Sequence, residues 1–509
     1  MNDYVMFCNS TGNQTINIIP AIQFGIKSAV LISTEHAEKS GWTKKLLNLM
    51  AERGIYASTE KISGVEEKNP IALSEKLTSV SKQYDRVAWN ISGGQKIPSI
   101  AFHNAFQKRI DAAFSDDMIL YVEGNDPAIW CYGKDLNCKS ERIDTGLTMT
   151  EILMLYNSKP VEQTELYPSA SDETSKKLDV GRKALECYMK DKYFREAFFC
   201  TMSPPEEMPG TVKGLRDYIR KEILNDVKPS LKDLGVRKTG YEGFEKNLKS
   251  IIDKIDAGKD MPEIKELAKK IKIIGKPDDI YNDYWDSIKN CILDTVTKRL
   301  ASFKHKLFVV SNPKLQDIKQ LISEIQSIGG IIEPSDEQIL YKEDIKKFSS
   351  FGRNGFLFEW MVAASVIDVI RDNAQIKDSI TDVHCNVKTR RADDQEAKPD
   401  SELDIVIAAK SGRLIILELK TYEFSGDIAK SKEGTAYKKS GPFGKAVIIG
   451  PLLKEMVTVG ADSKKQYPAY IADKIIEQED TAYQNGIDYI YFDNITVKLR
   501  KELHIKDLS

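Results

Sequence analysis

Two acidic residues and one lysine stand in two apolar segments near the C-terminal end of the chain. Asp404 lies in "LDIVIAA", and Glu418 and Lys420 lie in "RLIILELK". Apolar runs of this length are typical of strands, and paired strands project alternate side chains to opposite faces. We therefore expect a hairpin that presents all three charged side chains on one face.

The loop of this hairpin sets its register. We expect a three-residue loop over 411–413, in which Gly412 supplies the positive φ that such loops commonly need. Asp404 then lies opposite Lys420 and on the same face as Glu418. A two-residue loop would shift the register and separate the charges.

Charged side chains on an apolar hairpin are costly to bury unless they are paired or neutralised by a cation. A hard divalent ion such as Mg²⁺ or Mn²⁺ meets this need, because it prefers carboxylates, water and phosphate oxygens as ligands. Asp404 and Glu418 would hold the ion, and Lys420 would lie near the attacking water or the charge that develops on the phosphate. This pattern predicts phosphodiester hydrolysis. The alternative is a structural ion pair between Lys420 and Asp404 at a partly exposed strand end.

Two further acids bear on this prediction. Glu359 falls on the apolar face of the helical pattern "FLFEWMVAASV", so its carboxylate needs a partner. The alternative is a glutamate at the edge of that face, reaching solvent. Asp400, in "KPDSELD", follows Pro399 and precedes polar residues, which indicates a loop. We therefore favour Asp404 over Asp400 as the strand acid.

Polar residues also gather in two loops near the N-terminus, each directly after an apolar run. The first loop contains Ser10, Thr11, Gly12, Asn13 and Gln14, and the second contains Ser92, Gly93, Gly94, Gln95 and Lys96. Backbone amides at a tight glycine turn and at a helix N-terminus bind anions, and a lysine adds charge. The spacing fits neither GxGxxG nor GxxxxGK[ST], which disfavours nicotinamide dinucleotides and NTP hydrolysis. The two loops predict a pocket for phosphates and bases, and the alternative is an ordinary capped turn.

The pattern of the whole chain predicts an α/β protein. Apolar, β-rich runs alternate with helical patterns over 4–123, which is typical of a mostly parallel, Rossmann-like sheet. We assign this domain to 1–145, a linker to 146–175 and an all-helical segment to 176–345. A mixed α/β domain built around the hairpin fills 346–509, and ligands in the first domain belong at the carboxyl ends of its strands.

Composition limits the classes of protein to which the chain can belong. The 509 residues carry a formal net charge of −2, so any nucleic-acid surface must be local. Seven cysteines are scattered without a CxxC pair, which argues against a zinc site and a disulfide framework. No apolar run approaches the length of a membrane span, and the N-terminus lacks a signal-peptide pattern. We expect a cytoplasmic protein with reduced thiols and no membrane partner.

The two ends of the chain resemble a known arrangement. "NSTGNQTINIIPAI" and "NISGGQK" resemble the CRISPR-associated Rossmann-fold (CARF) domain. "GFLFEWMVAASV", "ELDIVIAAKSGRLIILELKT" and "YKKSGPFGKAVII" resemble the PD-(D/E)xK nuclease domain of the CRISPR ancillary CARF nucleases. The order of the two domains is also theirs, whereas the helical middle is not covered. Leu403 stands where the name of the motif has proline.

This resemblance implies a homodimer whose CARF domains bind one cyclic oligoadenylate ring, with cyclic tetra-adenylate favoured, as a messenger of type III CRISPR antiviral defence. The ring would activate an Mg²⁺- or Mn²⁺-dependent endonuclease that cleaves DNA, RNA or both. By motif match, Glu359, Asp404 and Glu418 take the places of the metal-binding acids and Lys420 that of the catalytic lysine. The loops 10–14 and 92–96 take the places of the ligand loops.

Two other functions stay open on the sequence alone. One is a non-enzymatic regulator that senses the ring and recruits other molecules through its helical segment. The other is a ligand-independent restriction-type nuclease, which the polar first loop and the Gly-Gly turn disfavour.

Overall fold

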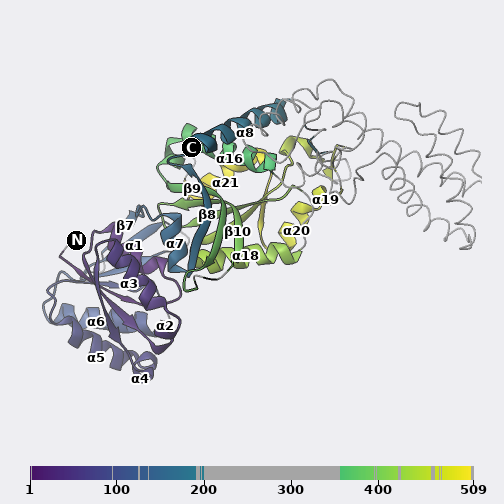
Figure 1. The fold of residues 1–509 in the computed structure, drawn as a ribbon. Coiled ribbons are helices and arrows are strands. Elements are labelled where there is room, and N and C mark those ends of the chain that lie inside the picture. The colour runs from purple at the N-terminus through teal and green to yellow at the C-terminus, as the bar shows by residue number, and fades with distance from the viewer. Residues whose placement is uncertain are drawn as a thin grey trace, which may run out of the picture.

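The structure is a computed structural model of the chain (Figure 1). The residues that it describes are 1, 3–93, 96–123, 127–135, 137–190, 195, 198–199, 356–394, 396, 398–421, 426–459, 465–468, 471 and 473–505. Two α/β units lie side by side, with the N-terminal unit at the lower left of Figure 1. Most of the predicted all-helical segment, 176–345, lies outside the described residues.

The first unit is built on a seven-stranded sheet in the order β3-β2-β1-β4-β5-β6-β7. Its strands are β1 (Val5–Asn9), β2 (Ser28–Ser33), β3 (Tyr56–Lys61), β4 (Val87–Asn90), β5 (Met118–Val122), β6 (Ala128–Tyr132) and β7 (Cys138–Arg142). The strands β1 to β5 are parallel, whereas β6 and β7 add an antiparallel edge. The predicted Rossmann-like arrangement is confirmed.

Helices cover both faces of this sheet because strand side chains alternate between two apolar cores. The helices are α1 (Thr15–Gln23), α2 (Glu35–Lys39), α3 (Trp42–Glu52), α4 (Gly64–Lys68), α5 (Pro70–Ser81) and α6 (Lys96–Asp111). On one face Met6 and Cys8 of β1 pack with α1 and α3. On the other face Phe7 packs with Trp89 and with α5 and α6.

A buried ion pair stabilises the core that contains Phe7 and Trp89. Arg109 Nε donates to Asp117 Oδ2 at 2.6 Å, and both side chains are almost completely buried. Asp117 also accepts hydrogen bonds from the backbone N–H of Val87 at 3.0 Å and from Trp89 Nε1 at 3.1 Å. One carboxylate therefore joins α6, β4 and the turn before β5.

The second unit is built on a six-stranded sheet in the order β15-β12-β11-β10-β9-β8. Its strands are β8 (Ser158–Tyr167), β9 (Ile380–Arg391), β10 (Ser401–Ala409), β11 (Leu414–Leu419), β12 (Gly444–Ile449) and β15 (Asp488–Ile490), and a separate small sheet pairs β13 (Thr458–Val459) with β14 (Lys465–Gln466). The neighbours β8 to β11 are antiparallel, whereas β11, β12 and β15 run parallel.

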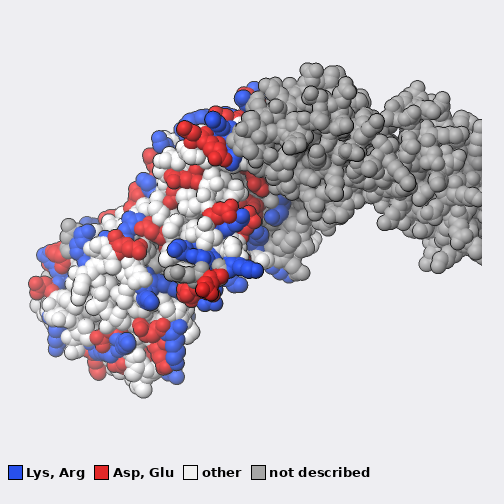
Figure 2. All heavy atoms as spheres, viewed as in Figure 1, with Lys and Arg blue, Asp and Glu red and all other residues white. Residues whose placement is uncertain are grey.

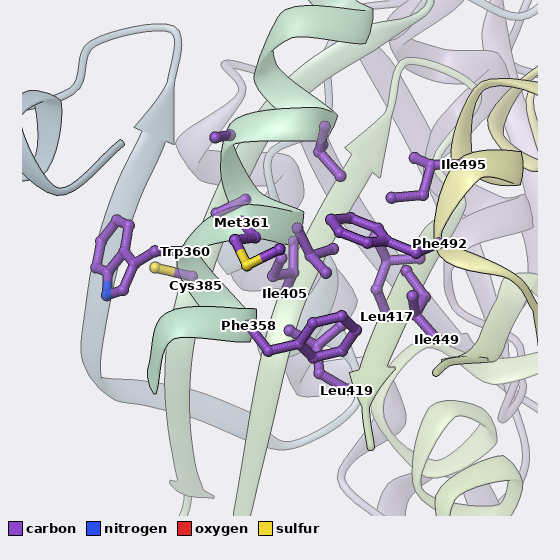
Figure 3. Packing of buried hydrophobic residues seen from close by; sticks show 14 of the residues in the cluster. Phe358, Trp360, Met361, Cys385, Ile405, Leu417, Leu419, Ile449, Phe492 and Ile495 are labelled. Carbon is purple, nitrogen blue, oxygen red and sulfur yellow. The ribbon is translucent and has the colours of Figure 1, made fainter. Parts of the chain in front are cut away.

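The helices of the second unit lie on both faces of its sheet. They are α7 (Met149–Leu155), α8 (Asp172–Lys190), α16 (Phe356–Asp372), α17 (Ala374–Lys377), α18 (Gly426–Ser440), α19 (Asp473–Ile476), α20 (Gln478–Gln484) and α21 (Ile495–Glu502), with short 3₁₀ turns η3 (Gly441–Phe443), η4 (Lys454–Met456) and η5 (Phe492–Asn494). Figure 3 shows Phe358 and Met361 of α16 packed against Ile405 and Leu417 of the hairpin. On α8, a Cβ at Gly181 would lie 2.1 Å from the Trp360 carbonyl oxygen, so glycine permits the close packing of α8 on α16.

The prediction of a linker over 146–175 is corrected by this sheet. The stretch contains α7 and β8, and β8 pairs with β9 as the edge strand. Most residues of β8 are polar because much of the strand faces solvent, and a polar edge strand resembles a linker in sequence. The second unit is therefore made of two stretches that lie on either side of 191–355 in the sequence.

The hairpin forms as predicted, but its loop lies one residue earlier. Gly412 has φ +80°, as expected. The loop is 410–412, since Ala409 N donates to Arg413 O at 2.9 Å and β10 pairs with β11 in the same register, Ile405 opposite Leu417. This change moves the register by two residues, so the side chains keep their faces. Asp404 now lies opposite Glu418 instead of Lys420.

Two smaller expectations concern cysteines and membranes. In the described part of the chain, Cys8, Cys131, Cys138 and Cys385 are free thiols. No helix among the described residues has both the length and the apolar character that a membrane span needs.

The buried ion pair gives the first testable prediction. Replacing Asp117 with Ala leaves the Arg109 guanidinium charged and buried, so we expect a loss of about 3–5 kcal/mol in the free energy of unfolding. The neighbouring Asp116→Ala is the matched control: Asp116 pairs with Arg86 at the surface at 3.0 Å, with 57% of its side chain exposed, and should cost about 0–1 kcal/mol. Urea unfolding followed by tryptophan fluorescence measures both, and equal effects would contradict the assignment.

Candidate functional site

The hairpin brings two carboxylates together at the end of the second sheet. Glu418 is 1% exposed, and the register places it beside the partly exposed Asp404. Asp404 Oδ2 accepts a hydrogen bond from the backbone N–H of Leu419 at 2.7 Å, which fixes that carboxylate beside β11. The structure therefore brings together Asp404 and Glu418, the two acids that the sequence places on one face of the hairpin.

Two lysines face the buried carboxylate. Lys420 Nζ lies 3.7 Å from Glu418 Oε2, and Lys432 Nζ of α18 lies 2.7 Å from the same oxygen. Lys432 was not predicted from the sequence. It is one of four lysines in "KSKEGTAYKK", and only the packing of α18 over the sheet decides which of them reaches Glu418.

Glu359 approaches the site from α16. The pKa of its carboxyl group is raised to about 7, first by burial and then by the negative charges of Asp404 and Glu402, against the opposing charge of Lys420. The pKa of Glu418 is also raised, first by burial and then by Asp404, against the opposing charges of Lys432 and Lys420. Three carboxyl groups, those of Glu359, Asp404 and Glu418, therefore share this end of the sheet with two lysines.

An excess of carboxyl groups over lysines suits a cation, which would favour their ionised form. Asp404 and Glu418 offer two carboxylates, which is the number that Mg²⁺ or Mn²⁺ commonly takes from protein while it keeps water and substrate oxygens. Nevertheless, among the residues that the structure describes, no three His, Cys, Asp or Glu side chains are grouped to hold one metal ion. The arrangement fits a two-carboxylate site, with Glu359 close enough to Asp404 to respond to its charge.

Asp400 has a different partner. Lys439 Nζ donates to its two carboxylate oxygens at 2.8 and 3.1 Å, and Thr389 Oγ1 donates to Oδ1 at 3.0 Å. These bonds tie the end of α18 to the start of β10. Asp400 thus pairs with Lys439 and Thr389, whereas Asp404 lies beside Glu418.

The two polar loops of the first unit meet at the carboxyl ends of β1 and β4. A Cβ at Gly93 would lie 3.1 Å from Asn17 Oδ1 and 3.4 Å from Thr11 Oγ1, so the second turn packs directly on the first loop. Thr11, Gly12 and Asn13 reach the surface in part, and Lys96, the first residue of α6, is exposed. Gly94 and Gln95 lie outside the described residues.

Three residues of the first loop region hold buried polar atoms that have no hydrogen-bond partner among the residues that the structure describes. These atoms are Asn9 Oδ1, both side-chain polar atoms of Gln14, and Asn17 Oδ1. By contrast, Ser10 is buried and bonded to Thr43 Oγ1 at 3.0 Å. Buried polar groups normally have partners, so these atoms mark a place where a polar ligand or water would be stabilised.

The raised pKa of Glu359 gives a prediction about stability. Its folded-state pKa of about 7 exceeds its ordinary value of 4.5, so its contribution to stability is full below pH 4.5 and is lost as pH rises through 7. Glu359→Gln should therefore stabilise the metal-free protein at pH 8 by up to about 3 kcal/mol relative to its effect at pH 4.5. Thermal unfolding in EDTA tests this, with the exposed Glu186→Gln as control. An effect independent of pH would contradict it.

Comparison with known proteins supports part of the sequence analysis. A family model described as the Card1 CARF domain matches residues 11–132. That range includes the first loop from Thr11 onward and the whole of the second loop. The chain therefore carries a CARF domain at its N-terminus. No curated protein matches the chain.

Two solved structures share the fold over almost the whole length. Protein VC1899 from Vibrio cholerae has 12% sequence identity and a TM-score of 0.54, with 98% of each chain covered. Can2 from Sulfobacillus thermosulfidooxidans, solved in complex with cyclic tetra-adenylate, has 14% identity and a TM-score of 0.52, with 98% of this chain and 99% of that chain covered. At such identities the likeness concerns the fold.

Proposed function

We propose that the protein is a cyclic-oligoadenylate-activated, metal-dependent endonuclease of type III CRISPR defence. The observation that carries this proposal is the meeting of Asp404, Glu418 and Lys420 at one end of the second sheet, in a chain whose first unit is a CARF domain. A binding module has no need to place such charges on an apolar hairpin, because burying them is costly.

The sensing half of the proposal rests on the first unit. The loops 10–14 and 92–96 are proposed to bind the ring, whose phosphates suit backbone amides and Lys96 and whose bases suit the unpartnered polar atoms near Gln14. The similar fold of Can2, which was solved with cyclic tetra-adenylate, favours that ring. A ring with twofold symmetry fits two equivalent loops, so we propose a homodimer.

The catalytic half rests on the hairpin. Asp404 and Glu418 would hold Mg²⁺ or Mn²⁺, with Glu359 proposed as an additional acid close to them. When bound, the ion would neutralise the phosphate and lower the pKa of a water molecule. Lys420 would stabilise the charge that develops on the phosphate oxygens, and Lys432 would hold Glu418 in place.

The surface favours a nucleic-acid substrate at this place. Figure 2 shows acidic and basic side chains interleaved over most of the visible face, with basic side chains gathered over α18. Lys430 and Lys438 on this helix are exposed, whereas Lys432 turns toward the acids. Lysines beside a hydrolytic site attract the phosphate backbone of DNA or RNA without selecting its sequence.

Cleavage is the direct test of the catalytic half. We expect wild-type protein with Mn²⁺ and cyclic tetra-adenylate to cleave labelled single-stranded RNA, single-stranded DNA or supercoiled plasmid. Glu418→Ala and Lys420→Ala should each lower the rate by about 100-fold or more, because they remove a metal ligand or transition-state charge. Glu433→Ala, on the exposed face of α18 next to Lys432, is the matched control and should cleave like wild type.

The same assay separates this proposal from its alternatives. Full activity without any ring would indicate a ligand-independent nuclease. Ring binding without cleavage of any of the three substrates would indicate a non-enzymatic regulator.

Ring binding itself gives a separate prediction. Thermal-shift titration with cyclic tri-, tetra- and hexa-adenylate should give the largest stabilisation with the tetra-adenylate ring. Lys96→Ala should weaken its affinity by about tenfold, because a charge-assisted bond to phosphate is lost. Lys108→Ala, exposed at the other end of α6, should have no effect, and equal effects of the two substitutions would count against the assigned loops.

A further inference from the structure

Tyr156 lies at the junction of the two units, directly after α7. Its hydroxyl donates to Asn13 Oδ1 at 3.1 Å and lies 2.7 Å from Thr15 Oγ1. A tyrosine hydroxyl has one proton, so donation to Asn13 makes Thr15 the donor of the second bond. Tyr156 is thereby bonded to the first loop and to the first residue of α1.

The same side chain also touches the second unit. A Cβ at Gly441 would lie 2.3 Å from the Tyr156 hydroxyl oxygen and 2.6 Å from its Cζ atom. Gly441 has φ +65° and directly follows α18, the helix that carries Lys432. Figure 1 shows α7 between the first unit and α18, and α7 contacts both α3 and α18. Tyr156 therefore joins the first loop to the C-terminal end of α18, the helix whose Lys432 contacts Glu418.

A second contact leads from the same place to the hairpin. A Cβ at Gly412 would lie 3.0 Å from Ile19 Cδ1 and 3.4 Å from Thr15 Cγ2, both on α1. The backbone N–H and the hydroxyl of Thr145 both donate to the Lys410 carbonyl oxygen, at 2.9 and 2.8 Å. The loop that connects β10 and β11 is thus fastened to the first unit. Thr15 touches both Tyr156 and this loop.

Burial keeps the Tyr156 hydroxyl protonated, so that it remains the donor to Asn13. The pKa of its hydroxyl is raised to about 12, chiefly by burial, so it keeps its proton over the physiological range. A change at Asn13 must then redirect that proton or move the ring that rests on Gly441. Either response reaches α18 through direct contact and needs no long chain of side chains.

We infer that Tyr156 is a positioning residue that couples the state of the loop 10–14 to the placement of α18, and so to the pairing of Lys432 with Glu418. The inference rests on the proposed function, because it concerns the regulation of that same site. A ligand that binds Asn13 competes with the Tyr156 hydroxyl for the same oxygen, so it favours one arrangement of the junction over the other. Such differential contact is what coupling between two sites requires.

Tyr156→Phe tests this inference because it removes the hydroxyl and keeps the aromatic ring over Gly441. We expect the ratio of ring-stimulated to basal cleavage to fall by about tenfold. Thr15→Val is the second variant, since it removes the other hydroxyl and keeps a branched side chain beside Gly412. It should lower the ratio in the same direction. Tyr483→Phe, with the tyrosine 84% exposed, is the control and should keep the full ratio.

Hydrogen exchange provides a readout that does not depend on cleavage. In the wild type, cyclic tetra-adenylate should change the exchange of peptides that cover α18, and Tyr156→Phe should abolish that change while the ring still binds. A wild-type response that persists in both variants, or no response of α18 despite ring binding, would overturn the coupling and leave the proposed function intact. Failure of every ring to bind the wild type would overturn the sensing function and the coupling together.

Discussion

The buried carboxylate of Glu418 is the constraint on which much of the second unit depends. An ionised group that is 1% exposed is unfavourable unless opposite charge lies beside it. Lys432 and Lys420 provide that charge, and Lys432 does so only because α18 crosses the sheet at the right place. The position of α18 is fixed in turn at its C-terminal end, where Lys439 binds Asp400 and Gly441 receives Tyr156. The pairing of carboxyl groups with lysines at this site thus depends on how α18 is held.

That helix is held from both units. The apolar core on one face of the first sheet is continuous with the side chains beneath α18, including Val406 and Ile416 of the hairpin. The other face of the second sheet packs against α16, which brings Glu359 toward Asp404. The candidate site lies where these two packing layers meet at the end of the strands. A shift in either layer would alter the distances between its charges, because close-packed interiors transmit displacement.

The second unit is assembled from two stretches of chain that are separated in sequence by 191–355. The strand β8 and the helix α8 come before 191–355 in the chain, yet β8 completes the sheet and α8 packs on α16. The charge network of Arg413, Glu502 and Lys498 joins the residue after the hairpin loop to α21, near the C-terminal end of the chain. The unit is therefore stabilised by contacts between stretches that are distant in sequence.

Some features of this protein follow from local pattern alone. Alternating apolar runs predicted the parallel sheet of the first unit, because its central strands β1, β2 and β4 bury both faces and leave a clear apolar signal. The apolar strands around Asp404 and Glu418 predicted the hairpin, since side-chain alternation is set by the backbone itself. Even the displaced loop kept the acids on one face, because its register moved by two residues.

Other features required the tertiary structure. The strand β8 was missed because an edge strand with one solvated side looks like a polar linker. Lys432 could not be chosen among its neighbouring lysines, because its role depends on the angle at which α18 crosses the sheet. Tyr156 contacts Asn13, which lies 143 positions before it in the chain, and Gly441, which lies 285 positions after it. No local pattern contains such pairs. Local sequence pattern specifies the apolar strands of the hairpin and the types of charged group they carry. Which charges meet was decided by the packing of α16 and α18 on the second sheet, because long-range contacts depend on how the elements are placed in space.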